Sequence, residues 1–226
     1  QDDALIFIRE TPLNTGSNLP PPISRDDDIR DDIWKLFLLY LTECEKNQRF
    51  ELLDLTMALI EVILASTGTI QGFLITMVLY IENIIQKIFE TPQIRTDENN
   101  TEFKEDIVNL REYIDHWEGN SNIKERAKGL LSMLNDPSTS MRMDILIKQG
   151  VIKHKHKKVW KDARPYLAHG GIVDFSKVDE YWHYQHYFIS MLYRLTLMFL
   201  GYKGKVLDYD GSKFEFVDFD WKSDTD

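Results

Sequence analysis

The chain is organised around residues 158–171, which read KVWKDARPYLAHGG and contain an arginine at 164 and a histidine at 169. Arginine keeps its positive charge near neutral pH, whereas histidine takes up or releases a proton there. The pair suits phosphate chemistry, because the arginine can hold a phosphodiester and the histidine can act as general base or acid. This chemistry requires no metal, and we expect no metal or other cofactor.

The same spacing also has a purely structural interpretation. Residues five apart lie about 140° from one another around an unbroken helix, so the two side chains would diverge. Pro165 removes a backbone donor and crowds the preceding turn, so it can kink the helix or begin a new one. Gly170 and Gly171 then form a strong stop signal. The pattern alone favours a structural helix end over a catalytic site.

The residues before Arg164 are rich in lysine and histidine, although the net charge of the chain is −10. A local concentration of positive charge on an acidic background indicates a polyanion site. The acidic balance argues against indiscriminate coating of nucleic acid, so we expect RNA contacts to be confined to this stretch. Nonspecific attraction to the RNA backbone is assigned to Lys155, Lys157, Lys158 and Lys161.

Length and composition indicate a globular protein of a reducing compartment. The 226 residues include 43% hydrophobic ones, enough for one substantial domain with a real core. The single cysteine, Cys44, excludes an internal disulfide and a cysteine-based metal cluster, which favours the cytoplasm. Glu61 and Glu82 interrupt the most apolar runs, 57–65 and 72–85, so we expect no membrane span.

Helical periodicity runs through most of the chain after residue 25. Residues 1–25 are rich in proline and small polar residues and are predicted to be a linker or wrapping arm. Because the sequence starts at Gln1 rather than methionine, we expect a trimmed fragment of a longer protein. The predicted helices span about 29–45, 50–65, 69–89, 102–117, 122–134 and 138–148, followed by the basic helix and a last long helix that closes at Gly201.

Three of these helices carry specific expectations. In the helix at 29–45 core packing is favoured over partner binding for a broad apolar face built from Ile33, Trp34, Phe37, Leu38 and Leu41 and the neighbouring Leu39 and Tyr40. The next two helices are apolar nearly all round and are expected in the middle of a bundle. Within the second of them, Glu82 is either a half-exposed residue beside Lys87 or a buried group that orients a functional arginine or histidine; the first option is favoured.

Two features follow the arginine–histidine motif. His183 and His186 would share a helix face, but no third ligand is nearby in the sequence and their neighbours are aromatic, so packing is favoured over a metal site. Residues 205–219 alternate in polarity around Asp210 and Gly211, which predicts a β-hairpin that covers one end of the bundle.

The order of these elements resembles the C-terminal part of HEPN domains, most closely the Apea-like HEPN family associated with bacterial antiphage defence. The matching elements are Arg164, the pair His169 and Gly170, and Leu200 with Gly201 at the end of the next helix. The resemblance covers roughly the last 60 residues firmly and the earlier helices loosely. The chain departs from the family at Pro165, where active HEPN ribonucleases usually carry a polar residue.

The resemblance implies a mainly α-helical HEPN-like domain at 26–203, followed by a small C-terminal β-hairpin and acidic tail at 204–226. It implies a metal-independent endoribonuclease of an antiphage or toxin-like system, with Arg164 and His169 as catalytic residues. It also implies a homodimer in which the two motifs face each other, and a missing N-terminal sensor domain or partner protein. The alternative is a catalytically degenerate interaction, sensor or regulatory module, which Pro165 favours.

Overall fold

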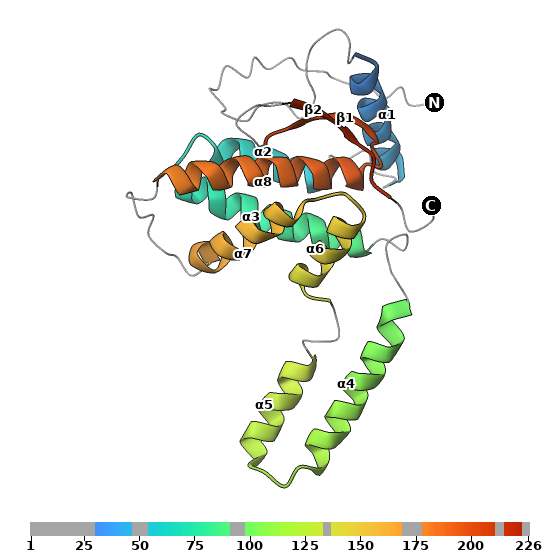
Figure 1. Ribbon diagram of the computed structural model, residues 1–226, viewed down its shortest axis with the longest axis vertical. Coiled ribbons are helices and arrows are strands. Elements are labelled where there is room, and N and C mark those ends of the chain that lie inside the picture. Colours follow the sequence, from blue (N-terminus) through green and yellow to red (C-terminus); the bar gives the residue numbers. More distant parts are fainter. Residues whose placement is uncertain are drawn as a thin grey trace, which may run out of the picture.

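The computed structural model describes residues 30–46, 54–90, 98–132, 137–168, 178–210 and 215–222. Within these ranges the protein is mainly helical, with a two-stranded antiparallel sheet near the C-terminus, which confirms the predicted fold class (Figure 1). The helices are α1 (Arg30–Lys46), α2 (Asp54–Ala65), α3 (Ile70–Glu90), α4 (Glu98–His116), α5 (Ser121–Ser132), α6 (Thr139–Lys148), α7 (His154–Ala168) and α8 (Val178–Phe199), and the strands are β1 (Gly204–Asp208) and β2 (Glu215–Phe219).

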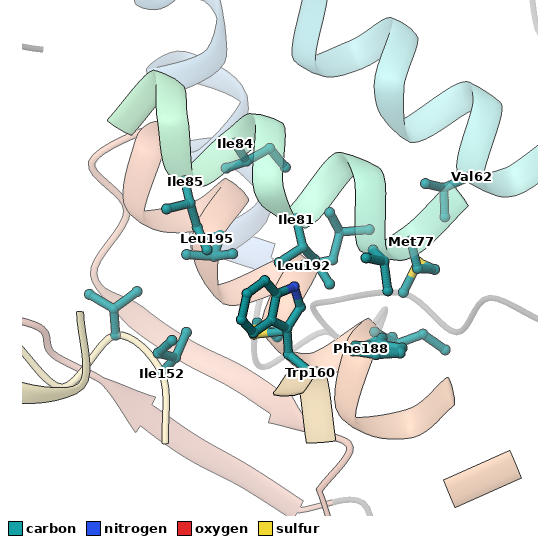
Figure 2. Packing of buried hydrophobic residues seen from close by; sticks show 14 of the residues in the cluster. Val62, Met77, Ile81, Ile84, Ile85, Ile152, Trp160, Phe188, Leu192 and Leu195 are labelled. Carbon is teal, nitrogen blue, oxygen red and sulfur yellow. The ribbon is translucent and has the colours of Figure 1, made fainter. Parts of the chain in front are cut away.

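Helix α3 is the centre of the fold and contacts α2, α6, α7 and α8. Its side chains at positions 74, 77, 78, 81, 84, 85 and 88 are all buried, a spacing that gives one broad apolar face. Figure 2 shows Ile81 and Ile85 facing Leu192 and Leu195 of α8, with Trp160 of α7 beside them. Although α3 is long and apolar enough to cross a membrane, this packing is that of a core helix and is compatible with a soluble protein.

Helix α2 was expected in the middle of the bundle, but it lies at the edge. Only Leu55, Ala58 and Val62 are buried, and they face α3. Met57 and Leu64 are 46% and 62% exposed. Hydrophobic side chains also cover the outer side of α2. Composition alone therefore predicted a central position in the bundle, which is wrong.

The prediction that the apolar face of α1 packs in the core is correct only for its edge at Leu39 and Tyr40. Trp34 and Leu38 are 57% and 60% exposed, and Ile33, Phe37 and Leu41 are also exposed. Leu36, Leu39 and Tyr40 lie against the core cluster, and the Tyr40 hydroxyl shares a hydrogen bond with Thr56 of α2 at 3.0 Å. Hydrophobic residues cover most of the circumference of α1, and packing uses only part of it.

Helices α4 and α5 form a helical hairpin that extends away from the rest of the protein in Figure 1. They contact one another, and Lys128 of α5 pairs with Asp115 of α4. Several large apolar side chains of this hairpin are exposed, among them Tyr113 at 72% and Leu130 at 65%. The packing of α4 against α5 therefore covers only part of the apolar faces from which both helices were predicted.

The strand pair is part of the core as well as a cover for it. Val206 of β1 pairs with Val217 of β2, and Val206 and Phe219 are buried in the same cluster as α3 and α8. Gly201 has a φ of +72° and closes α8, where the Tyr202 N–H donates to the Leu197 carbonyl at 2.8 Å. The predicted helix end at Gly201 and the predicted antiparallel pairing are confirmed, whereas Gly211 lies outside the described residues.

Candidate functional site

Arg164 of α7 forms an ion pair with Glu82 of α3. The Arg164 Nε–H donates to Glu82 Oε1 at 2.7 Å, and the Arg164 guanidinium also lies 5.6 Å from the ring centre of Trp160, one turn earlier on α7. Trp160 is buried, so its ring holds the guanidinium close to the edge of the core. Two residues 82 positions apart are thereby joined on the surface of the bundle.

The two options for Glu82 each describe part of the arrangement. Its side chain is half-buried, with 24% exposed, and its partner is an arginine rather than Lys87. Lys87 instead pairs with Asp54 of α2 at 2.5 Å. An acid that accepts from Nε holds a guanidinium by one edge only, and the Arg164 side chain remains 44% exposed. The planar guanidinium therefore keeps its two terminal nitrogens for an anion such as phosphate.

The second half of the predicted motif, His169 with Gly170 and Gly171, lies outside the described residues. Helix α7 ends at Ala168, one residue before the histidine. Pro165 is exposed and lies inside α7, which continues as one helix to that end. Pro165 therefore does not begin a new helix.

The basic stretch divides into two parts with different surroundings. At the start of α7, Lys153 forms ion pairs with Asp208 and with Asp210, the latter at 2.8 Å. Lys155 lies 3.3 Å from the same Asp210 carboxylate. These acids belong to β1 and the residues that follow it, so the lysines attach the C-terminal strands to α7.

His156 lies at the centre of this attachment and is fully buried. Its Nδ1 accepts from the Lys153 N–H at 3.0 Å, and its Nε2 is 2.5 Å from Asp210 Oδ1. An Nδ1 that accepts carries no proton, so Nε2–H donates to Asp210 and the ring is neutral. Burial lowers the pKa of His156 even though Asp210 acts to raise it.

This contact has the form of a helix N-cap. Lys153 directly precedes α7, and the side chain three residues later satisfies its backbone N–H, as a glutamate does in a capping box. Burial acts to raise the pKa of Asp210, but the hydrogen bond from His156 and the lysine charges hold it well below its usual range. The group His156, Asp210, Lys153 and Lys155 is thus a structural junction.

The other predicted RNA-binding lysines lie farther along α7. Lys157 pairs with Asp144 of α6 at 2.5 Å, and only 13% of its side chain is exposed. Lys158 and Lys161 are exposed, and neither forms an ion pair with another described residue. Lys161 lies three residues before Arg164, so the two cations are neighbours on the helix surface.

A polar groove of about 430 Å³ runs beside Glu82, between α3 and α6. One wall is a stripe of α3 that includes Asn83, Gln86 and Glu90, and Arg142 of α6 lines the other. The sequence analysis did not find this groove. The sequence does contain a pattern that indicates a polar surface here, because Glu82, Asn83, Gln86 and Glu90 recur at helical spacing on a largely apolar helix.

The two histidines of α8 are not part of this region. The His183 ring packs edge-on against Tyr187 with ring centres 5.0 Å apart, and His183 is exposed. Burial lowers the pKa of His186, with a smaller effect from His183 in the same direction. In the part of the chain that the structure describes, no three histidine, cysteine or acidic side chains cluster as metal ligands would.

Comparisons with family models, with curated proteins and with solved structures find no match to this chain.

Proposed function

We propose that this protein is a metal-independent endoribonuclease of the HEPN type, with Arg164 and His169 as its catalytic residues. The observation that supports the proposal most is the contact between Arg164 and Glu82. A surface arginine that only capped a helix end would need no acid from a distant helix. Here Glu82 and Trp160 hold the guanidinium in one orientation while its terminal nitrogens stay accessible.

The reaction needs only groups that the chain and the RNA supply. The 2′-hydroxyl oxygen attacks the adjacent phosphorus and loses its proton to His169, and the bond from phosphorus to the 5′-oxygen breaks. The leaving oxygen takes up a proton from solvent water, so the products are a 2′,3′-cyclic phosphate and a free 5′-hydroxyl. Arg164 binds the phosphate oxygens and stabilises the charge that develops on them. Lys161 and Lys158 attract the RNA backbone from the adjoining surface.

The proposal extends to assembly and setting. Residues five apart on a continuous helix point in divergent directions, so the proposal places a second copy of the chain across a two-fold axis, where it completes the site. The expected setting is the cytoplasm, in an antiphage or toxin-like system, with no membrane attachment and with a sensor domain or partner protein that controls cleavage. The antiphage or toxin-like setting follows from the resemblance to the Apea-like HEPN family, whereas the cytoplasmic location follows from the single cysteine and from the charged residues that interrupt the apolar runs.

A second candidate function is a catalytically degenerate interaction module. The exposed apolar face of α1 favours it, because a contiguous set of five large hydrophobic side chains on one helix is typical of a protein contact surface. Pro165, directly after the arginine, also favours the interaction module, since active HEPN ribonucleases usually carry a polar residue there.

Incubation of RNA with the purified protein in excess chelator separates the two candidates. We expect cleavage that survives the chelator, leaves cyclic-phosphate ends and disappears in His169→Ala. The matched control is His154→Ala, which removes an exposed histidine at the other end of α7 and should leave cleavage unchanged. Equal activity of the wild type and His169→Ala would exclude the catalytic assignment and favour the interaction module.

Assembly is tested by mixing Arg164→Ala and His169→Ala subunits. If each site uses residues from both copies, mixed dimers regain part of the cleavage that neither variant shows alone. Light scattering over a wide concentration range gives the oligomeric state independently. A monomer at every concentration would exclude the shared site.

A further inference from the structure

The groove between α3 and α6 shares Glu82 with the arginine site. Glu82 contributes to the groove wall and also holds Arg164, so whatever is bound at Arg164 lies at one end of this groove. The volume of about 430 Å³ falls within the usual range for small-ligand sites, roughly 300 to 1,000 Å³. An RNA strand that leaves the arginine site in this direction would enter the groove.

Arg142 is the cationic group with the fewest partners in the groove. Its guanidinium lies 5.6 Å from the ring centre of Phe89, and its buried Nε has no hydrogen-bond partner. No described carboxylate pairs with it, although Glu90 lines the same groove. The other groove cation, Lys87, is already paired with Asp54. Arg142 therefore keeps a planar set of donors for an anion of the ligand.

The α3 wall carries groups that suit the edge of a nucleobase. Asn83 and Gln86 are exposed and lie three residues apart on one face, and each amide offers a donor and an acceptor. The Gln86 Nε2–H donates to Glu90 Oε1 at 3.0 Å, which orients the amide and leaves its oxygen available. A base edge also carries both donors and acceptors, whereas a run of phosphates would be repelled by Glu90.

The spacing of the two arginines fits neighbouring parts of one strand. Arg164 contacts residue 82 and Arg142 packs on residue 89, so their anchor points are separated by about 10 Å along α3, taking 1.5 Å per residue. Arginine at each end with amides between them is an arrangement that can bind phosphate, base and phosphate in turn.

From these contacts we infer that the groove binds the single-stranded nucleotide next to the phosphate held by Arg164. Arg142 binds the phosphate of that nucleotide, and Asn83 and Gln86 hydrogen-bond to its base. The inference rests on the proposed function and adds a subsite to it. It requires no chemistry at the groove, only affinity and positioning.

The test is binding of a short 2′-O-methyl oligonucleotide, which has no free 2′-hydroxyl and cannot be cleaved, measured by fluorescence anisotropy in chelator. Arg142→Gln removes the guanidinium and its charge and keeps a polar side chain. We expect it to weaken binding about tenfold, the usual size for a hydrogen bond to a charged group. The slope of log affinity against log salt should fall by about 0.7, as for one phosphate of a single strand.

Asn83→Ala should weaken binding by about three- to tenfold, with no change in the salt slope. The matched controls lie on the α4–α5 hairpin: Arg111→Gln and Asn122→Ala remove the same groups from exposed positions and should leave both quantities unchanged. Arg142→Gln that binds like the wild type would overturn the subsite, whether or not the wild type cleaves RNA.

Cleavage kinetics distinguish this failure from failure of the proposed function. If both hold, Arg142→Gln raises KM and leaves kcat nearly unchanged, whereas Arg164→Ala removes kcat. A wild type that cleaves RNA, with Arg142→Gln unchanged in KM and affinity, contradicts the subsite alone. A wild type that neither binds the oligonucleotide nor cleaves RNA contradicts both.

Discussion

The two ends of α7 both carry basic residues and differ in what surrounds their charges. At the N-terminal end, Lys153, Lys155 and His156 face the acids of the C-terminal strands. At the C-terminal end, Lys161 is exposed and Arg164 keeps its terminal nitrogens accessible. A count of positive residues treats both ends as one patch. The contacts show that the first end is part of the scaffold, and we propose that the second end binds the polyanion.

The largest expected effect comes from breaking the N-terminal junction. Asp210→Asn leaves His156 and two lysines without their carboxylate in a largely buried site, and loss of one member of a buried ionic group costs about 3 to 5 kcal/mol. Urea denaturation should show a decrease of this size in the free energy of unfolding. Asp162→Asn, an exposed acid on the same helix, should change it by less than about 0.5 kcal/mol. Similar values for the two variants would mean that the junction is not structural.

The fold was more predictable than the site because helices are encoded locally and ion pairs are not. The apolar stripe of α3, the end of α8 at Gly201 and the alternation in β1 and β2 are each readable from neighbouring residues. The pairing of Lys153 with Asp210, or of Arg164 with Glu82, depends on which helices lie side by side. Glu82 stands out in the sequence as an acid on an apolar helix, and the sequence favours Lys87 over a functional arginine or histidine as its neighbour, whereas its partner is Arg164.

The error at α1 has a related cause. Periodicity found the helix and its apolar face, since hydrophobic residues recur at helical spacing. It cannot tell which part of a wide apolar surface meets the core when Leu36, Leu39 and Tyr40 offer a second edge. Contacts of α1 with α2 and with the residues after α8 determine which side of α1 is buried.

The pH dependence of stability gives a second way to probe the junction. His156 is neutral in the folded protein and its pKa is lowered by burial, so the unfolded chain binds its proton first, at about pH 6.5. The free energy of unfolding is therefore fully retained above that pH and decreases as the pH falls below it, by at most about 1.4 kcal/mol per pH unit for one group.

The His156→Asn variant should show a smaller decrease between about pH 6.5 and pH 5, because asparagine does not titrate, and the decrease that remains is that of His186, whose pKa is also lowered by burial. The carboxylate of Asp210 adds a further loss at lower pH, since its pKa is lowered in the folded state and its stabilisation disappears as it becomes protonated. Denaturation midpoints measured across this range for both proteins test the assignment. Parallel curves for the wild type and His156→Asn would show that His156 does not cause the decrease.

A smaller effect on stability and a larger one on activity are expected at the other end of α7. Glu82→Gln keeps the shape of the side chain but weakens its hold on the Arg164 Nε–H. We expect kcat for RNA cleavage to fall about tenfold with less than about 1 kcal/mol lost from the free energy of unfolding. Glu105→Gln on α4 is the matched control and should match the wild type in both. An unchanged kcat in Glu82→Gln would exclude a positioning role for Glu82.

The most direct test of the difference between the two ends is the salt dependence of RNA affinity in two double variants. One variant carries Lys158→Ala and Lys161→Ala; the other carries Lys155→Ala and Lys157→Ala, whose lysines pair with Asp210 and Asp144. Both are compared with the wild type by anisotropy, using the same uncleavable oligonucleotide over a range of salt concentrations. Circular dichroism confirms that each variant is folded.

We predict that the first variant reduces the slope of log affinity against log salt by about 1.4, the value for two phosphates of a single strand, and that the second leaves it unchanged. An equal reduction in both variants, or a reduction only in the second, would contradict the division of α7 into a structural end and an RNA-binding end.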